Sequence, residues 1–290
     1  MNASTGPLTS PTSTASERAG SRGAGRSARG LRSIGWYLPA ILLFVAAIVL
    51  WELSVGALKL QTFVFPKPTA IVAALQANWN EGRFALLPSA LATLQEALIG
   101  LVIGTLLGLA AAFVSARWVT ARGVLIPLAV AANAVPIIAF APLINNWFGL
   151  LSPLSKSLMA AVLVFFPVMA NVTRGLVDVE PAAIELMRSY AAGDTAILRK
   201  VRIPNALPYF FTAMKVATTL SLIGAIVGEY FGGSATVLGR MIVQSASALK
   251  FDITWAAIVL GALTGIVFYL IVVVVERLVI PWHTTIRGDL

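Results

Sequence analysis

The sequence contains no cysteine and only one histidine, His283. The lack of cysteine excludes a disulfide framework, a thiolate metal site and a thiol nucleophile. A single histidine argues against a histidine metal centre or a proton relay, so no metal ion or cofactor is expected. Charged residues make up only 11% of the chain, against about 25% in soluble domains. We therefore predict an all-α polytopic membrane protein, and we interpret the net charge of +9 as a signal of membrane orientation rather than of nucleic-acid binding.

Six apolar segments are long enough to cross a bilayer, which takes about 20 residues. The predicted spans are 36–55, 88–114, 124–140, 154–176, 207–228 and 254–280. The third is interrupted by Pro127 and Pro136 and runs into Pro142. Residues 1–35 are rich in Ser, Gly and Arg and have few large apolar side chains, which predicts a disordered tail. The expected organisation is this tail, a transmembrane domain over 36–282 and a short tail over 283–290.

Lysine and arginine are distributed unevenly between the segments that join the spans. With the N-terminus inside, fourteen of them fall in inner segments and six in outer ones. This bias predicts that both termini and the polar segment 179–208 are cytoplasmic. A cleaved signal peptide at the N-terminus is the alternative, but the first apolar run is longer than the about 7–15 residues of such a segment.

The segment 179–208 is a polar island between the fourth and fifth spans. Pro181 is suited to the first position of a helix, and Ile184, Met187 and Ala191 would form one apolar stripe along it. Gly193 is expected to follow that helix as its C′ residue. Asp194 is then expected to cap a second short helix, which carries Ile197 and three basic residues and which Pro204 should end. We predict a cytoplasmic helix–turn–helix that docks a partner protein; a basic helix pair lying on anionic lipid is the alternative.

Two further patterns bear on how the helices pack. Residues 70–79, preceded by Pro68 and Thr69, place Ile71, Leu75 and Trp79 on one helical face, and this helix would lie either at the outer membrane interface or on the bundle. Glycines recur at every fourth position in three spans, which predicts close helix contacts within the bundle, a dimer face, or both; they are Gly100, Gly104, Gly108, Gly224, Gly228, Gly261 and Gly265.

Polar groups inside spans are costly and usually face protein or water. Glu96 and Glu229 are such groups, whereas Lys215 is expected to snorkel to the interface. Irregular backbone at membrane depth is tolerated only inside protein or beside a wet cavity. We therefore assign a translocation path to the broken third span and the fifth span, with the alternatives that Glu96 marks only the interface and that the broken span is a structural kink. The candidate path residues are Glu96, Asn133, Pro136, Asn145, Asn146 and Glu229.

The stretch from Gly233 to Gly239 comes near the pattern of a phosphate-binding loop, but five residues separate its glycines where that loop has four. It continues with Arg240 and Met241 instead of the Lys-Ser/Thr that such a loop requires. If ATP drives this protein, another chain must bind it, so the protein itself is not expected to be an enzyme.

The polar island resembles the EAA loop of bacterial ABC-transporter permeases, whose pattern is Glu-Ala-Ala, three residues, Gly, nine residues, Ile, any residue, Leu-Pro. Glu185 and Pro204 match strictly, and Ala191 takes the place of the Gly. Further stretches from about residue 35 to residue 282 resemble the nitrate/sulfonate/taurine branch, most of all its permeases for pyrimidine thiamine precursors or riboflavin. Among them are Phe-Pro-Lys-Pro from Phe65 and Gly-Glu-Tyr-Phe-Gly-Gly from Gly228.

This resemblance implies a permease subunit of an ATP-driven importer in the bacterial inner membrane. It implies three protein partners: cytoplasmic ABC ATPase subunits, an extracytoplasmic substrate-binding protein and a second permease copy, giving a homodimer. The implied substrate is a heteroaromatic vitamin or vitamin precursor, with nitrate, taurine or aliphatic sulfonates as the alternative. An ion-coupled secondary transporter and a membrane scaffold are the alternatives of other classes. The residues assigned to ATPase coupling are Ile184, Glu185, Met187, Arg188, Ala191, Gly193, Ile197 and Pro204.

Overall fold

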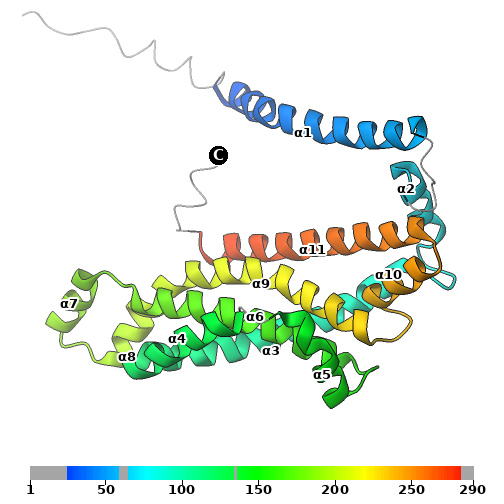
Figure 1. The fold of residues 1–290 in the computed structure, drawn as a ribbon. Helices are drawn as coiled ribbons and strands as arrows, with labels where there is room; N and C mark the ends of the chain where they lie inside the picture. Colours follow the sequence, from blue (N-terminus) through cyan, green and yellow to red (C-terminus); the bar gives the residue numbers. More distant parts are fainter. Residues whose placement is uncertain (1–24, 59–64, 134–135, 282–290) are drawn as a thin grey trace, which may run out of the picture. The chain divides into compact units, whose positions relative to one another are not determined.

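A computed structural model describes residues 25–58, 65–133 and 136–281, and this part of the chain is helical without strands, as predicted (Figure 1). Five helical segments are long and apolar enough to cross a membrane: Pro39–Ala57, Leu86–Arg117, Pro153–Val177, Asp194–Phe231 and Phe251–Val279. They correspond to predicted spans 1, 2, 4, 5 and 6. The expected tails fall largely outside the described residues, at 1–24 and 282–290, but helix α1 (Gly25–Ala57) already begins inside the segment assigned to the N-terminal tail.

The chain divides into two compact units, residues 1–59 and 60–290. Helix α1 belongs to the first unit. The second unit contains α2 (Pro68–Ala77), α3 (Leu86–Arg117), α4 (Val119–Asn133), α5 (Ile137–Phe148), α6 (Pro153–Val177), α7 (Pro181–Ser189), α8 (Asp194–Ile197), the π-helical turn η1 (Leu198–Arg202), α9 (Ile203–Phe231), α10 (Leu238–Ser247) and α11 (Phe251–Val279).

The predicted third span is two helices rather than one. Helix α4 runs through Pro127 without a break, and α5 likewise contains Pro142. The break lies at Pro136, which caps the start of α5 in an extended conformation. Neither helix reaches the length of a span. The expectation that Pro127 interrupts the segment was therefore wrong, because a single proline removes one backbone hydrogen bond and a helix supported by its neighbours can tolerate that loss.

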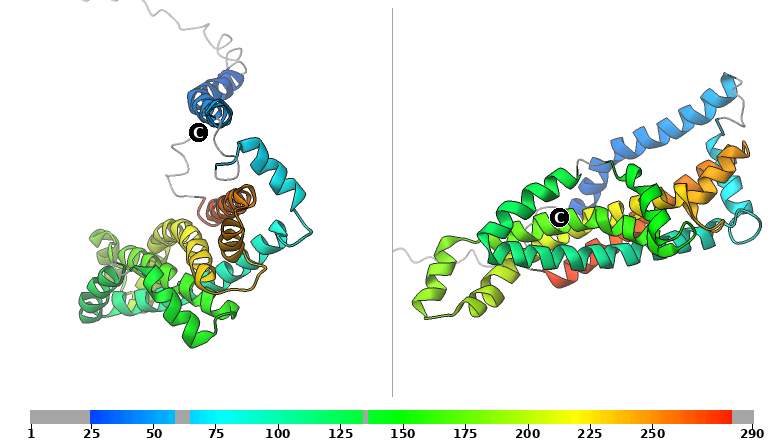
Figure 2. Two further views of the ribbon diagram at one scale, coloured as in Figure 1. Left: turned by 45° about the vertical axis from the view of Figure 1, so that its right-hand side comes forward. Right: turned by 60° about the horizontal axis from the view of Figure 1, so that its bottom comes forward.

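The core of the second unit is the trio α3, α6 and α9, which run side by side with α6 between the other two (Figures 1 and 2). Helix α6 is the most buried of the long helices, with half of its most apolar window inside the protein. The main apolar cluster is drawn from these three helices and α11 and comprises Leu101, Ala112, Val164, Val168, Val172, Leu176, Ala206, Ala213, Ala217 and Phe268.

The short helix α2 packs on α11 through Ile71 and Ala74, which are 5% and 6% exposed. Phe65 adds an edge-to-face ring contact with Trp255 at 6.4 Å between centroids. Of the two placements that its amphipathic pattern left open, the structure shows the one against the bundle.

Glycines explain how closely α6 approaches both neighbours. A Cβ at Gly104 on α3 would lie 2.5 Å from the Ala161 carbonyl oxygen, and one at Gly224 on α9 would lie 2.6 Å from the Ala160 Cα. These glycines therefore serve packing inside the chain. Gly261 on α11 differs, because its nearest neighbours would be 3.8 Å away.

This difference yields a matched prediction. Gly104→Ala pushes a methyl group into backbone that cannot move aside, and we expect it to destabilise the protein by about 1–3 kcal/mol. Gly261→Ala meets only ordinary contacts and should change stability little. Thermal unfolding of the two purified variants in the same detergent checks this, and equal melting temperatures would contradict the proposed α3–α6 contact.

Candidate functional site

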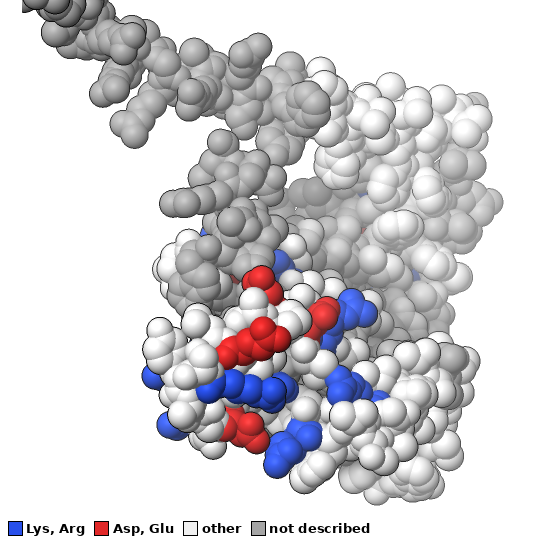
Figure 3. Space-filling view, turned by 90° about the vertical axis from the view of Figure 1, so that its left-hand side faces the viewer, with Lys and Arg blue, Asp and Glu red and all other residues white. Residues whose placement is uncertain are grey.

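Helices α7 and α8 project from one end of the bundle (Figure 2). Helix α7 begins at Pro181, as predicted, since proline suits the first turn of a helix. None of its residues is buried. Charged side chains of both signs gather at this end (Figure 3), and the exposed ones include Glu185, Arg188, Asp194, Arg199 and Lys200. We call the segment Pro181–Arg202 the projecting element.

The turn of the projecting element lies at Ala191 and not at Gly193. Ala191 has a φ of +54°, and its N–H bonds the Arg188 carbonyl while the N–H of Ala192 bonds the Met187 carbonyl. These two bonds form a Schellman motif with Ala191 at C′. The prediction that Gly193 holds this position was wrong: Gly193 is extended at φ −71° and precedes α8. Its carbonyl accepts the N–H groups of Ala196 and Ile197, so Asp194 is the first residue of α8 rather than its cap.

The second helix does not stop at Pro204. Helix α8 continues through η1 into α9, so that one helical run extends from Asp194 to Phe231. In η1 the N–H of Ile203 bonds the Leu198 carbonyl five residues back. This wider turn lies directly before Pro204, which sits in the first turn of α9 and has no N–H to donate. Pro204 is therefore tolerated at a point where an ordinary α-helix would be interrupted.

Asn205 fastens the start of α9 to the end of α6. Its side-chain amide donates to the carbonyls of Gly175 at 2.8 Å and Asp178 at 3.1 Å. A Cβ at Gly175 would lie 2.8 Å from the Ala206 Cα, so the two backbones are in close contact there. These contacts attach the C-terminal end of the projecting element to helix α6.

The residues assigned to ATPase coupling differ in their exposure to solvent. Glu185 and Arg188 are exposed, and Ile184 and Met187 are half-buried. Ile197 is only 4% exposed, so it supports the element from beneath and does not present an apolar surface. Ile184, Arg188 and Ile197 also line a cavity of about 260 Å³ beside the end of α3, where Arg117 contributes another guanidinium.

Two exposed apolar residues of this element were not singled out from the sequence. Leu186 is 59% exposed and Tyr190 is 78% exposed. They are four residues apart, which places them on one face of α7 and its C-terminal turn. The sequence contained a signal for them. If the stripe of Ile184, Met187 and Ala191 faces inward, Leu186 and Tyr190 are the remaining large apolar side chains of this helix and its C-terminal turn.

A buried polar cluster lies at the opposite end of the bundle, where α3, α6, α9 and α10 meet. Glu229 is 0% exposed, Lys156 is 1% exposed and Glu96 is 6% exposed. Glu229 Oε2 accepts the N–H of Gly239 at 2.6 Å, and Thr93 Oγ1 accepts the N–H of Leu238 at 2.9 Å. The start of α10 is therefore capped by side chains of α9 and α3, which satisfy backbone donors that a helix N-terminus leaves free.

Lys156 is one of the six lysine and arginine residues that the sequence analysis counted in outer segments, and the structure shows it buried in α6. Its ammonium group donates to the Leu150 carbonyl and, at 2.9 Å, to Ser155 Oγ. A Cβ at Gly228 would lie 3.2 Å from its Cγ, so the small residue lets the lysine lie against α9.

The structure joins three of the candidate path residues and leaves three apart. Asn145 on α5 is 1% exposed and its amide donates to the Gly228 carbonyl at 3.2 Å, which places it beside the helix position of Glu229. Asn146 is exposed on the next position of α5, and Asn133 and Pro136 flank the break between α4 and α5. Glu96 lies inside α3, and its side chain is buried among the packed helices.

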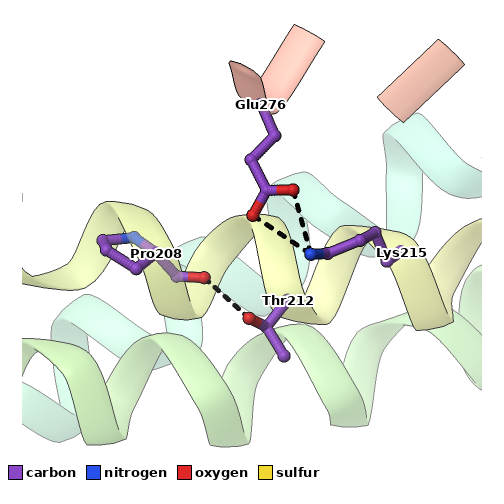
Figure 4. A network of polar contacts seen from close by, with 4 residues as sticks. All are labelled: Pro208, Thr212, Lys215 and Glu276. Carbon is purple, nitrogen blue, oxygen red and sulfur yellow. Dashed lines mark hydrogen bonds and ion pairs between the residues drawn. The ribbon is translucent and has the colours of Figure 1, made fainter. Parts of the chain in front are cut away.

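Lys215 pairs with a charged side chain of another helix, a contact that the sequence analysis did not predict. Its Nζ lies 2.9 Å from Glu276 Oε2, forming an ion pair between α9 and α11 (Figure 4). One turn earlier on α9, the Thr212 hydroxyl donates to the Pro208 carbonyl at 2.9 Å. The sequence identified Lys215 as a charge within the fifth predicted span, but it did not indicate the contact with Glu276.

Comparison with known proteins identifies the family to which the chain belongs. Residues 104–282 match the model of the binding-protein-dependent transport system inner membrane component. The chain belongs to this family. The matched segment includes the whole projecting element, Lys156 and Glu229, and it begins within α3 after Glu96.

Individual relatives extend the similarity over most of the chain. The formylaminopyrimidine transport permease protein ThiX of Halalkalibacterium halodurans is 29% identical over 85% of this chain and 96% of its own length. The riboflavin transport system permease protein RibX of Chloroflexus aurantiacus is 29% identical, over 89% and 95%. A putative aliphatic sulfonates transport permease protein SsuC of Bacillus subtilis is 26% identical, over 91% and 94%. The protein is thus an ABC transporter permease, and the resemblance to this class of permeases is confirmed at the level of the family.

The αL conformation of Ala191 yields a prediction for this permease. An L-residue with a Cβ pays about 1–2 kcal/mol in the left-handed region, whereas glycine does not. We expect Ala191→Gly to stabilise the projecting element by about 1 kcal/mol. Hydrogen exchange of the α7 amides should slow in this variant. Ala192→Gly is the control, because Ala192 has no positive φ and its replacement should leave exchange unchanged or faster. Faster exchange in Ala191→Gly would contradict the observed turn.

Proposed function

We propose that this permease is the membrane subunit of an ATP-driven importer, and that the projecting element is its docking handle for a separate ATPase subunit. The orientation behind this proposal comes from the Lys and Arg bias, which puts both termini and the projecting element in the cytoplasm of a bacterial cell, with the protein in the inner membrane. An extracytoplasmic binding protein would then face the end of the bundle that carries α5 and α10. A second copy of the permease would complete the membrane part as a homodimer.

The observation that carries the docking proposal is the exposed apolar pair on a helix with no buried residue. Leu186 and Tyr190 are 59% and 78% exposed at an end of the bundle rich in charged side chains. Large apolar groups in a polar, water-facing region mark a surface that another protein covers. Glu185 and Arg188 lie on the exposed side of the same helix and are suited to polar contacts around that apolar centre.

The helical run from Asp194 to Phe231 supports a mechanism for transmitting force. A load on α7 reaches α8, which continues into α9 without a flexible loop. The hydrogen bonds of Asn205 couple the same point to α6. We propose that closure of the ATPases moves the projecting elements of the two copies and turns the bundles as rigid bodies between inward- and outward-facing states.

Docking is tested by copurification of the ATPase subunit with the permease. Leu186→Glu places a charge at the centre of the proposed contact, and we expect at least a tenfold loss of bound ATPase, which corresponds to about 1.4 kcal/mol. Glu185→Lys should uncouple ATP hydrolysis from uptake while membrane insertion stays intact. Thr195→Glu is the matched control, because Thr195 is exposed on the neighbouring helix and lies off the apolar pair.

An unchanged yield of ATPase with Leu186→Glu would remove the docking assignment. The lipid-surface alternative predicts a different result: the variant would release the element from anionic vesicles without affecting the ATPase. Measuring substrate uptake in vesicles distinguishes the importer from an ion-coupled transporter. Uptake by the importer requires ATP and does not respond to an imposed ion gradient.

We further propose that the translocation path runs along the broken α4–α5 pair and α9, with Asn133, Pro136 and Asn146 at its wall. Asn145, Glu96 and Glu229 would brace that wall from behind, because their side chains are buried. Broken helices of this kind are tolerated at membrane depth where they line a cavity.

The proposed substrate is a heteroaromatic vitamin or vitamin precursor of the pyrimidine or flavin type. Two of the relatives are named for formylaminopyrimidine and riboflavin. Trp147, Phe148, Tyr230 and Phe231 are exposed near the ends of α5 and α9, where flat rings can stack on a planar solute. Aliphatic sulfonates or taurine are the second candidate, because other relatives carry those names.

A binding assay on the cognate extracytoplasmic protein decides between the two substrate classes. We expect a formylaminopyrimidine or riboflavin to bind at least a hundredfold more tightly than taurine or an alkanesulfonate, which is about 2.7 kcal/mol. The reverse order would overturn the heteroaromatic assignment and leave the docking proposal intact.

A further inference from the structure

The buried cluster at the α10 end contains an imbalance of charge. Glu96, Glu229 and Lys156 are each at most 6% exposed. If all three were ionised, two negative charges would face one positive charge inside the bundle. An uncompensated charge is strongly unfavourable in such a place, so the cluster needs one further positive charge to be neutral.

The contacts between the side chains indicate where the missing positive charge lies. The carboxyl groups of Glu96 and Glu229 lie within hydrogen-bonding reach of each other, and Lys156 acts electrostatically on both. Two carboxylates are both acceptors, so they attract only with a proton between them. One oxygen of each group, Glu96 Oε2 and Glu229 Oε1, is buried without a conventional donor in the described part of the chain.

The two carboxyl groups are not equivalent. Glu229 accepts the Gly239 N–H at 2.6 Å and also interacts with the Thr93 hydroxyl, which is the environment of a charged carboxylate. Glu96 has no such set of donors among the described residues. A protonated Glu96 beside an ionised Glu229 and Lys156 leaves the cluster neutral. Within the described residues, Lys156 is the one cation that acts electrostatically on both carboxyl groups. Asn145 from α5 and the first N–H groups of α10 add uncharged polar groups beside them.

We propose that Glu96 and Glu229 form a buried proton-binding site, and that the single exchangeable proton they share locks the start of α10 onto α3 and α9. The cap of α10 draws one acceptor from each of these two helices. Loss of the proton sets two negative charges against one positive charge, so α3 and α9 are pushed apart beneath the cap. Gly239 packs closely against this carboxylate, because a Cβ at position 239 would lie 2.8 Å from Glu229 Oε2.

Infrared spectroscopy of the full-length permease in lipid nanodiscs tests the site directly. At neutral pH a solvated glutamate, with a pKa of about 4.3, is ionised, so a carboxylic-acid C=O band there reports a buried acid. We expect that band in the wild type and its loss in Glu96→Gln. Glu229→Gln should lose it as well, because Glu96 must then ionise to balance Lys156. Glu81→Gln, which removes an exposed carboxyl group, is the control and should keep it.

Hydrogen exchange of residues 238–247 tests the lock. In the wild type, protection of α10 should fall as pH rises, beyond the intrinsic rise in exchange, by up to about tenfold per pH unit. Glu96→Gln mimics the protonated acid and should make protection independent of pH. A band that survives in either glutamine variant would overturn the shared-proton site. So would α10 protection that depends on sodium or potassium at fixed pH, since a bound metal cation would then supply the missing charge.

Discussion

The structure depends on how closely α6 approaches α3 and α9. Lipid is as apolar as the side chains facing it, so burial from water contributes little to helix association within a membrane, and close contact between backbones contributes most. Glycines on α3 and α9 supply that closeness against Ala160 and Ala161 of α6. The three helices form a rigid unit, and both candidate sites are attached to it, one at each end.

Helix α9 connects these two ends. Its helical run begins in the exposed element at Asp194 and finishes at Phe231, two residues beyond buried Glu229. The π-helical turn before Pro204 preserves this continuity, because the wider turn accommodates a residue that cannot donate a hydrogen bond. A single rod therefore carries the proposed docking handle and the carboxylate that caps α10.

Much of this fold could be predicted from the order of residues. Hydrophobic length located spans 2, 4 and 6 within a few residues, since the requirement to cross a bilayer acts on the composition of a continuous stretch. Proline was a poorer guide: Pro127 and Pro204 lie within helical runs, whereas Pro136 marks a break. The effect of a proline depends on whether neighbouring helices or a wider turn accommodate its missing donor, and a linear sequence does not contain that information. The linear sequence likewise did not show that Ala191, rather than Gly193, adopts the αL conformation at the end of α7.

By itself, the sequence determined an all-helical membrane protein with a polar element between its fourth and fifth spans, because composition and length act locally. It also showed that Glu96, Lys215 and Glu229 were out of place in apolar surroundings. Only the tertiary structure decided their partners: Lys215 meets Glu276 across 61 positions, and Glu96 meets Glu229 beside Lys156. Charge pairing in a low-dielectric interior is set by distance in space, and that distance exists only after the helices have packed.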